Sequence, residues 1–284
     1  MFLGLPNSGK SSFIGAFWHV VETGEIDAHY KVTTQPSDRE YLNALRASFL
    51  NCQAPERTKT DFVKNIELSI LDKTSKEEIE LVFPDLSGET FSSQFAYRKI
   101  TDDYIDQIQN CNGIMLFINP DFVKKANLIA DSFLMFGSEE LSNNVEESAS
   151  SLVPWDVKMS QTQVVIVDVL QMIFKYITKP CKISIVVSAW DLIKNMPLAE
   201  NIQTPAEWLS RELPLLKQYL DANNASFKYN VFGVSAQGGS YKEDENDIIS
   251  KLQELVKQSE RICVQHESEI TNDITIPIKW LING

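Results

Sequence analysis

The first residues of the chain carry a pattern that could bind phosphate. Residues 4–11, Gly-Leu-Pro-Asn-Ser-Gly-Lys-Ser, match G-x-x-x-x-G-K-[ST]. The glycines let the backbone curl, so that successive N–H groups face a phosphate at the N-terminus of the following helix. Lys10 can then reach the β- and γ-phosphates of a nucleotide, and the Ser11 hydroxyl can bind Mg²⁺. The residues that this phosphate-binding loop (P-loop) would place around the ligand are Asn7, Ser8, Gly9, Lys10, Ser11 and Ser12.

A shorter acidic pattern appears later in the chain. Residues 85–88, Asp-Leu-Ser-Gly, fit D-x-x-G and follow a run of alternating apolar residues. At the end of a strand, Asp85 could hold the hydration shell of Mg²⁺, and the Gly88 N–H could meet a terminal phosphate. The pattern is common by composition alone, and a plain turn at the end of a strand is the alternative interpretation.

The apolar pattern indicates which elements would position these loops. A helix pattern follows the P-loop directly, and residues 38–52 form another. Residues 65–71 and 78–83 alternate between apolar and polar types around a polar turn, which predicts a β-hairpin. Three continuous apolar runs predict buried parallel strands, and helices are predicted between and after them. These strands are residues 113–118, 183–187 and 231–234, and the helices are residues 160–177, 204–223 (with Thr204 as N-cap) and 247–265.

This order of elements predicts an α/β fold. A doubly wound, mostly parallel sheet with one antiparallel edge strand accounts for it, with the ligand at the carboxyl ends of the strands. We expect a single domain over residues 1–284, with a helical insert at about 22–56 and an acidic loop at about 121–159. Only residues 1–3 precede the P-loop, so either the natural chain starts upstream of Met1 or the first strand is curtailed.

Charge and composition exclude several classes of protein. The chain has 26 Lys and Arg against 39 Asp and Glu, a net charge of −13. Nucleic-acid binders and proteins held on anionic membranes need a basic surface, so we expect neither partner. The longest strongly apolar stretch, residues 164–174, is too short to span a bilayer. The four cysteines lie far apart, without zinc or disulfide spacing, which indicates a reduced, cytoplasmic protein.

Two later motifs complete an ordered set. Residues 188–191, Ser-Ala-Trp-Asp, and residues 235–237, Ser-Ala-Gln, follow the last two predicted strands. Together with the P-loop, the hairpin and D-x-x-G, they resemble the motifs of Ras-like P-loop GTPases of the translation-factor-related class. Four phrases further resemble bacterial double-GTPase domains. They are GLPNSGKS, DREYLNAL, DLSGE and IPIKWL, at residues 4–11, 38–45, 85–89 and 276–281.

The resemblance implies contacts to guanine. The family motif is [NT]-K-x-D, whose Asp accepts two hydrogen bonds from the base, and Asp191 matches that position. Ser188 can still donate a hydrogen bond, whereas Ala189 has no lysine stem to pack along the base. Trp190 either covers the base or packs in the core. Ser235, Ala236 and Gln237 take the place of the S-A-K motif, whose backbone would cover the guanine O6.

The resemblance also implies a threonine that binds Mg²⁺ and the γ-phosphate. Thr60 is favoured, because Arg57-Thr-Lys-Thr60 matches the R-x-x-T of heterotrimeric G-protein α subunits and the hairpin follows. Arg57 would then act as a built-in arginine finger, and a solvated basic turn is the alternative. Glu89 stands where many GTPases place a water-orienting Gln; it either acts on the attacking water or is a surface residue. Thr33, Thr34 and Thr58 compete with Thr60 for the metal.

The function implied is a Mg²⁺-dependent switch that binds GTP or GDP and hydrolyses GTP. The double-GTPase resemblance implies a bacterial multi-protein signalling or defence system, with a protein effector or a second GTPase as partner. One rival is an interaction module that binds GTP with little hydrolysis, as the absent Gln suggests. Another is a P-loop ATPase or kinase, against which the hairpin, D-x-x-G and the base motifs argue.

Overall fold

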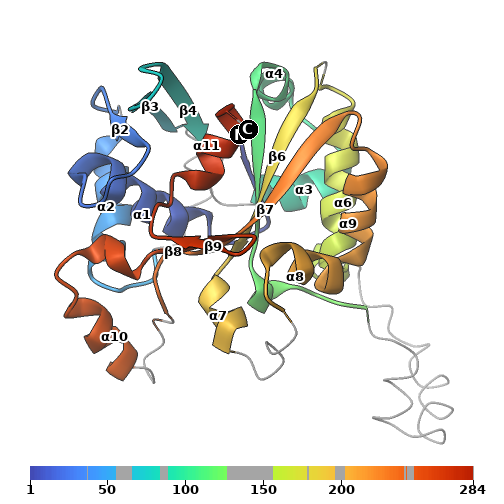
Figure 1. Cartoon of the computed structure of the whole chain (residues 1–284). Coiled ribbons are helices and arrows are strands. Elements are labelled where there is room, and N and C mark those ends of the chain that lie inside the picture. The colour runs from blue at the N-terminus through green and yellow to red at the C-terminus, as the bar shows by residue number, and fades with distance from the viewer. Residues whose placement is uncertain are drawn as a thin grey trace, which may run out of the picture.

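The computed structural model describes residues 1–36, 38–55, 66–83, 89–126, 156–177, 179–195, 202–239, 241 and 246–283. Its larger sheet has six strands in the order β1-β5-β6-β7-β8-β9 (Figure 1). The first four strands run parallel, and the last two are antiparallel to their neighbours. The strands are β1 (Phe2–Leu3), β5 (Gly113–Ile118), β6 (Cys181–Ser188), β7 (Phe227–Ser235), β8 (Cys263–His266) and β9 (Glu269–Thr271).

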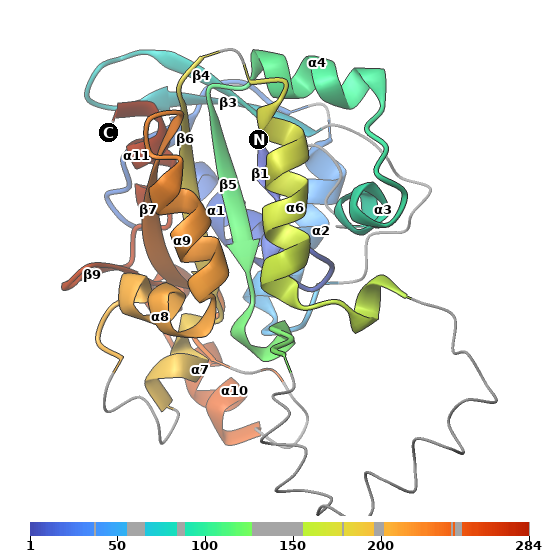
Figure 2. The same cartoon turned by 90° about the vertical axis from the view of Figure 1, so that its right-hand side faces the viewer.

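Helices cover both faces of this sheet, because its central strands are apolar on both sides. Phe117 joins a core cluster with α1 (Lys10–Thr23), α2 (Arg39–Leu50) and α11 (Ile276–Asn283). The next residue along, Ile118, joins a second cluster. The helices of that second cluster are α3 (Glu89–Tyr97), α4 (Asp102–Asn110), α6 (Thr162–Phe174), α7 (Trp190–Asn195), α8 (Pro205–Glu212) and α9 (Pro214–Ala222). Figure 2 shows α6 and α9 in front of the sheet and α1 and α2 behind it.

The predicted hairpin forms part of a separate, three-stranded sheet. Strands β3 (Ile66–Asp72) and β4 (Glu78–Phe83) pair antiparallel, and β2 (Tyr30–Val32), which was not predicted, extends the sheet beyond β3. The Phe83 ring meets the Phe2 ring edge-on at 4.6 Å between centroids. This aromatic contact places the end of the hairpin beside β1 and the start of the P-loop.

The predicted α/β fold class, with a mostly parallel sheet and an antiparallel edge, is confirmed. The antiparallel edge consists of β8 and β9, and β8 begins within the stretch 247–265, for which a helix was predicted. That prediction was wrong beyond α10 (Asn246–Gln253), which is followed by a short 3₁₀ helix, η6 (Gln258–Arg261). A strand forms here instead of a helix because Ile262 and Val264 are both buried. They are two residues apart, which is the spacing of side chains on one face of a strand.

The helix predicted over residues 204–223 is divided into α8 and α9. Pro214 lacks the N–H that a continuous helix would use, so α8 ends and α9 begins with Pro214 at its first position. Thr204 is the N-cap of α8 as predicted, and with Glu207 it forms a capping box. Two further 3₁₀ turns, η1 (Pro120–Phe122) and η3 (Val157–Met159), lie on either side of residues 127–155, which fall outside the described ranges.

In the part of the chain that the structure describes, no helix is both long enough and apolar enough to cross a membrane.

Candidate functional site

The P-loop leads from β1 into the first turn of α1. Gly9 is the N-cap of α1 and has a φ of 92°, a left-handed conformation that favours glycine. A Cβ at this position would lie 2.7 Å from both Cβ and Oγ of Ser188. The second glycine of the motif is therefore required both by the turn and by the close approach of β6.

The Lys10 ammonium is held inside the curl of the loop. Its Nζ donates hydrogen bonds to Gly4 O at 2.8 Å, Leu5 O at 3.0 Å and Ser8 Oγ at 3.1 Å. The side chain is only 3% exposed. These acceptors are neutral, so a phosphate oxygen that replaced them would form a stronger, charge-assisted hydrogen bond. The loop thus places a buried cation where a polyanion can meet it.

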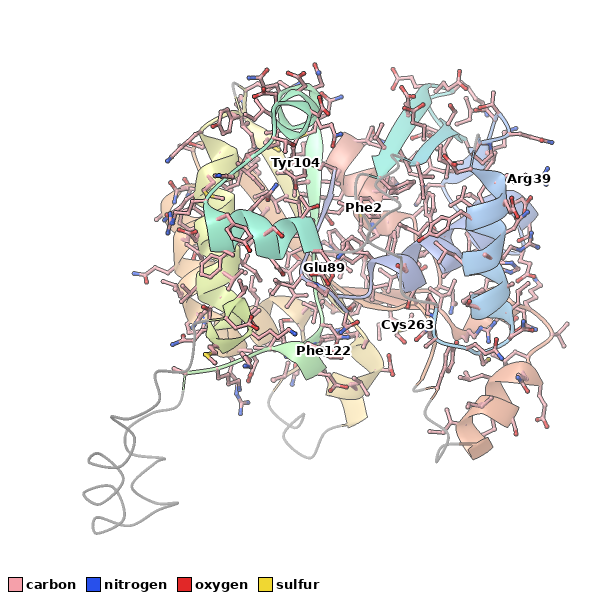
Figure 3. All side chains as sticks on the ribbon, turned by 180° about the vertical axis from the view of Figure 1, so that it is seen from behind. Phe2, Arg39, Glu89, Tyr104, Phe122 and Cys263 are labelled. Atoms are coloured by element: carbon pink, nitrogen blue, oxygen red, sulfur yellow. The ribbon has the colours of Figure 1, made fainter. Side chains whose placement is uncertain are left out.

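A cavity of about 1010 Å³ opens beside the P-loop and is lined by its residues 5–12. Asn119, the η1 and η3 turns and the start of α6 form other parts of its wall. Glu89, at the start of α3, also lines the cavity, as does Phe122 in η1, and Figure 3 labels both side chains. The volume is that of a site for a nucleotide-sized ligand.

The Ser11 hydroxyl fits a magnesium ligand, because Ser11 lines this cavity in the first turn of α1 and Mg²⁺ prefers oxygen donors. The other predicted metal residues, Thr60 and Asp85, lie outside the described residues, as do Arg57, Thr58 and Gly88. Among the described residues, no group of three or more His, Cys, Asp and Glu side chains could hold a metal ion.

The two competing threonines of the described part lie elsewhere. Thr33 donates its hydroxyl hydrogen bond to Glu78 Oε1 at 2.7 Å, at the edge of the small sheet. Neither Thr33 nor Thr34 lines the cavity. Thr33 is thus held by a structural contact.

Ser188 joins the Ser-Ala-Trp-Asp motif of residues 188–191 to the P-loop. Its Oγ donates to Ser8 O at 2.8 Å and lies 3.3 Å from Ile118 O, so the ends of β5 and β6 are tied to the loop. Ala189 follows with a φ of 47° and turns the chain into α7. The hydroxyl that was predicted to donate a hydrogen bond thus holds the P-loop.

Asp191 and Ser235 come together across the ends of β6 and β7. The Ser235 hydroxyl donates to Asp191 Oδ1 and accepts from the Gly238 N–H at 3.1 Å. Ala236 follows in the same loop, and the Gln237 carbonyl accepts from Tyr241 at 3.0 Å. Two motifs that are far apart in the sequence are therefore joined by one hydrogen bond.

Trp190 packs in the core, the second of its two predicted alternatives. Its ring is 1% exposed, and its Nε1 donates to Gln265 Oε1 at 2.9 Å. Gly233 of β7 makes room for the ring, because a Cβ there would lie 2.4 Å from a ring carbon. Trp190 fixes the start of α7 beside Asp191 and leaves no aromatic face for a base.

Sequence reasoning missed Asn119, which braces the P-loop from β5. Its Nδ2 donates to Asn7 O at 3.0 Å, and its Oδ1 accepts from Asp121 N at 3.1 Å. The signal was a polar residue directly after the apolar run 113–118, at the carboxyl end of a parallel strand. Two basic residues that line the cavity, Lys124 and Lys158, carried no motif that would have identified them.

The geometry at Gly9 predicts a measurable loss of stability. Gly9→Ala combines a left-handed φ with the contact against Ser188, and we expect the free energy of unfolding to fall by about 1–3 kcal/mol in urea titrations. Gly24→Ala is the matched control, because Gly24 has a φ of 65° but no atom within 4 Å of an added Cβ. Equal losses in the two variants would contradict the contact with Ser188.

The comparisons with known proteins identify one family. A family model described as Double-GTPase 1 matches residues 1–281 of the chain. No curated protein and no solved structure matches the chain significantly.

Proposed function

We propose that this chain, which belongs to the Double-GTPase 1 family, is a Mg²⁺-dependent switch that binds and hydrolyses GTP. The observation that carries the proposal is the arrangement around the P-loop. Lys10 is buried inside the loop, and Ser188 connects the loop to the strand end that leads to Asp191. The phosphate and base motifs are thus built as one unit across the strand ends.

In this proposal the phosphates lie against the loop. Lys10 exchanges its bonds to Gly4 O and Leu5 O for oxygens of the β- and γ-phosphates, while loop N–H groups and the helix N-terminus contribute further. Bound Mg²⁺ neutralises charge on these phosphates. The residues proposed to hold it are Ser11 and Thr60 directly and Asp85 through its hydration shell.

Asp191 is proposed to accept two hydrogen bonds from guanine. The hydrogen bond from Ser235 fixes the direction of its carboxylate, and the backbone of residues 235–237 is proposed to cover the guanine O6. Gly88 is proposed to sense the γ-phosphate, so that GTP orders a surface that GDP releases. An effector protein or a second GTPase is the partner proposed for that surface, within a bacterial signalling or defence system.

Hydrolysis tests the proposed role of Arg57. We expect Arg57→Ala to lower the single-turnover rate of GTP hydrolysis by about 10³-fold or more, because a finger in the same chain neutralises charge in the transition state. Arg39→Ala is the control. Arg39 lies on α2 and does not line the cavity, and its guanidinium forms an ion pair with the Glu22 carboxylate of α1 at 2.9 Å. A rate equal to that of the parent protein would exclude the finger.

Glu89 favours one alternative function. Glu89 lies at the start of α3 and lines the cavity. If the γ-phosphate binds in this cavity, the negative charge of the Glu89 carboxylate would repel it. The alternative is therefore a module that binds GTP but hydrolyses it slowly. Multiple-turnover phosphate release, measured with and without a candidate partner, separates the two: rapid release with either sample supports the hydrolysing switch.

A further inference from the structure

Two of the four cysteines lie together at the amino ends of neighbouring strands. Cys111 follows α4 and is separated from β5 by Asn112, and Cys181 is the first residue of β6. Figure 2 shows β5 and β6 side by side in the sheet. Gly113 of β5 pairs with Lys182 of β6, which places both cysteines at the same edge of the sheet. The P-loop contacts lie at the opposite, carboxyl ends of these strands. The pair therefore lies at the opposite end of the sheet from the P-loop.

The two thiols differ in their tendency to ionise. The neighbouring Cys181 thiol is the largest cause that lowers the pKa of Cys111 to about 6, against the effect of burial; the Met1 ammonium, Lys179 and the Gly113 N–H also lower it. The pKa of Cys181 is raised, first by the neighbouring Cys111 and then by burial, and its Sγ donates a hydrogen bond to Lys182 O at 3.5 Å. Cys111 is half-buried, whereas Cys181 is buried. Cys111 is thus the nucleophile of the pair, and Cys181 is the thiol held next to it.

The remaining cysteines supply internal controls. All four are free thiols. Cys52 is buried, and its sulfur accepts a hydrogen bond from Arg261 at 2.6 Å, in contact with α2. Cys263 is half-buried in β8, the same exposure class as Cys111. Reactivity that follows exposure alone would affect Cys263 as much as Cys111.

We propose that Cys111 and Cys181 form a peroxide-sensitive thiol pair that closes to a reversible disulfide. Continuing the β5–β6 register back from Gly113 and Lys182 places Asn112 opposite Cys181, so Cys111 is one residue further along, across strands about 4.8 Å apart. Cys181 belongs to the apolar cluster against which Cys111 packs, which keeps the two thiols within reach of the geometry that a disulfide requires. An oxidisable thiol with a second thiol beside it is the arrangement of peroxide-sensing cysteines. The bond would join the start of β5 to the start of β6.

The reaction balances with hydrogen peroxide as the oxidant. The Cys111 thiolate attacks one peroxide oxygen, the O–O bond breaks, and hydroxide leaves and takes up a proton to become water. The Cys181 sulfur then attacks the sulfur of the Cys111 sulfenic acid, the S–O bond breaks, and the Cys181 proton leaves with the oxygen as a second water. Overall, two thiols lose two electrons and two protons, and one peroxide becomes two waters.

The test is oxidation of the purified full chain with a small excess of hydrogen peroxide, followed by alkylation and peptide mass spectrometry. We expect a Cys111–Cys181 cross-link within one chain that dithiothreitol reverses. Cys263→Ser forms the same cross-link. Cys181→Ser accumulates a Cys111 sulfenic acid that dimedone traps, and Cys111→Ser leaves Cys181 as a thiol.

A second probe does not depend on oxidation. Phenylarsine oxide needs two adjacent thiols, so we expect the reduced protein to bind one equivalent, and Cys111→Ser and Cys181→Ser to bind none. Cys263→Ser keeps the full stoichiometry. Peroxide products confined to Cys263 or Cys52, cross-links only between chains, or arsenical binding that survives Cys181→Ser would each overturn the proposal.

Discussion

Replacing Lys10 by alanine is expected to lower the affinity for GTP about 100-fold. The ammonium is buried inside the P-loop, and the proposed complex exchanges its hydrogen bonds to Gly4 O and Leu5 O for bonds to phosphate oxygens. Two charge-assisted hydrogen bonds of about 1.5 kcal/mol each give about 3 kcal/mol, and each 1.4 kcal/mol is a factor of about ten in affinity. A titration with a fluorescent GTP analogue measures the change.

The control for this variant is Lys251→Ala. Lys251 is exposed on α10, so its removal changes the net charge equally but leaves the loop intact. Both variants should show the far-ultraviolet circular dichroism of the parent protein. Unchanged affinity in folded Lys10→Ala would contradict the assignment of the P-loop.

Asp191→Asn is expected to reverse the preference between two purine nucleotides. The asparagine amide cannot accept both guanine hydrogen bonds, so we expect a loss of GTP affinity of about 100-fold by the same conversion. Xanthine carries a carbonyl oxygen where guanine has its amino group, and the asparagine N–H can donate to it. Xanthosine triphosphate should therefore bind the variant more tightly than it binds the parent protein, which a competition titration measures.

Two further variants make this result specific. Asp103→Asn makes the same change of charge on the exposed surface of α4 and should leave the preference unchanged. Ser235→Ala removes the hydroxyl that orients Asp191, and we expect a smaller loss of GTP affinity without a gain for xanthosine triphosphate. If Asp191→Asn keeps the preference of the parent protein, Asp191 does not bind the base.

The local signals of the chain predicted the P-loop, the parallel strands and the hairpin, because each is written in a continuous stretch of residues. The division into α8 and α9 was missed because one helix was predicted across Pro214. Strand β8 was missed because a helix was predicted across Ile262 and Val264, which are both buried and have the two-residue spacing of a strand. Strand β2 was missed because its three residues, Tyr30–Val32, are too few to show a period of their own.

Contacts between distant segments explain the rest of the site. The sequence placed Asp191 and Ser235 in separate motifs, but only the neighbouring ends of β6 and β7 bring their side chains together. Ser188 was predicted to donate a hydrogen bond, and the acceptor it meets is the carbonyl of Ser8, which no pattern within either motif indicates. The bracing amide of Asn119 depends likewise on the approach of the P-loop to β5.

The most direct test of the guanine-nucleotide assignment is calorimetric titration of the purified protein with GTP, GDP and ATP, each with Mg²⁺ and with EDTA. We predict tight, Mg²⁺-dependent binding of GTP, binding of GDP at the same site, and far weaker binding of ATP. The Asp191–Ser235 pair is the proposed structural basis of that selectivity. A higher affinity for ATP than for GTP would contradict the account.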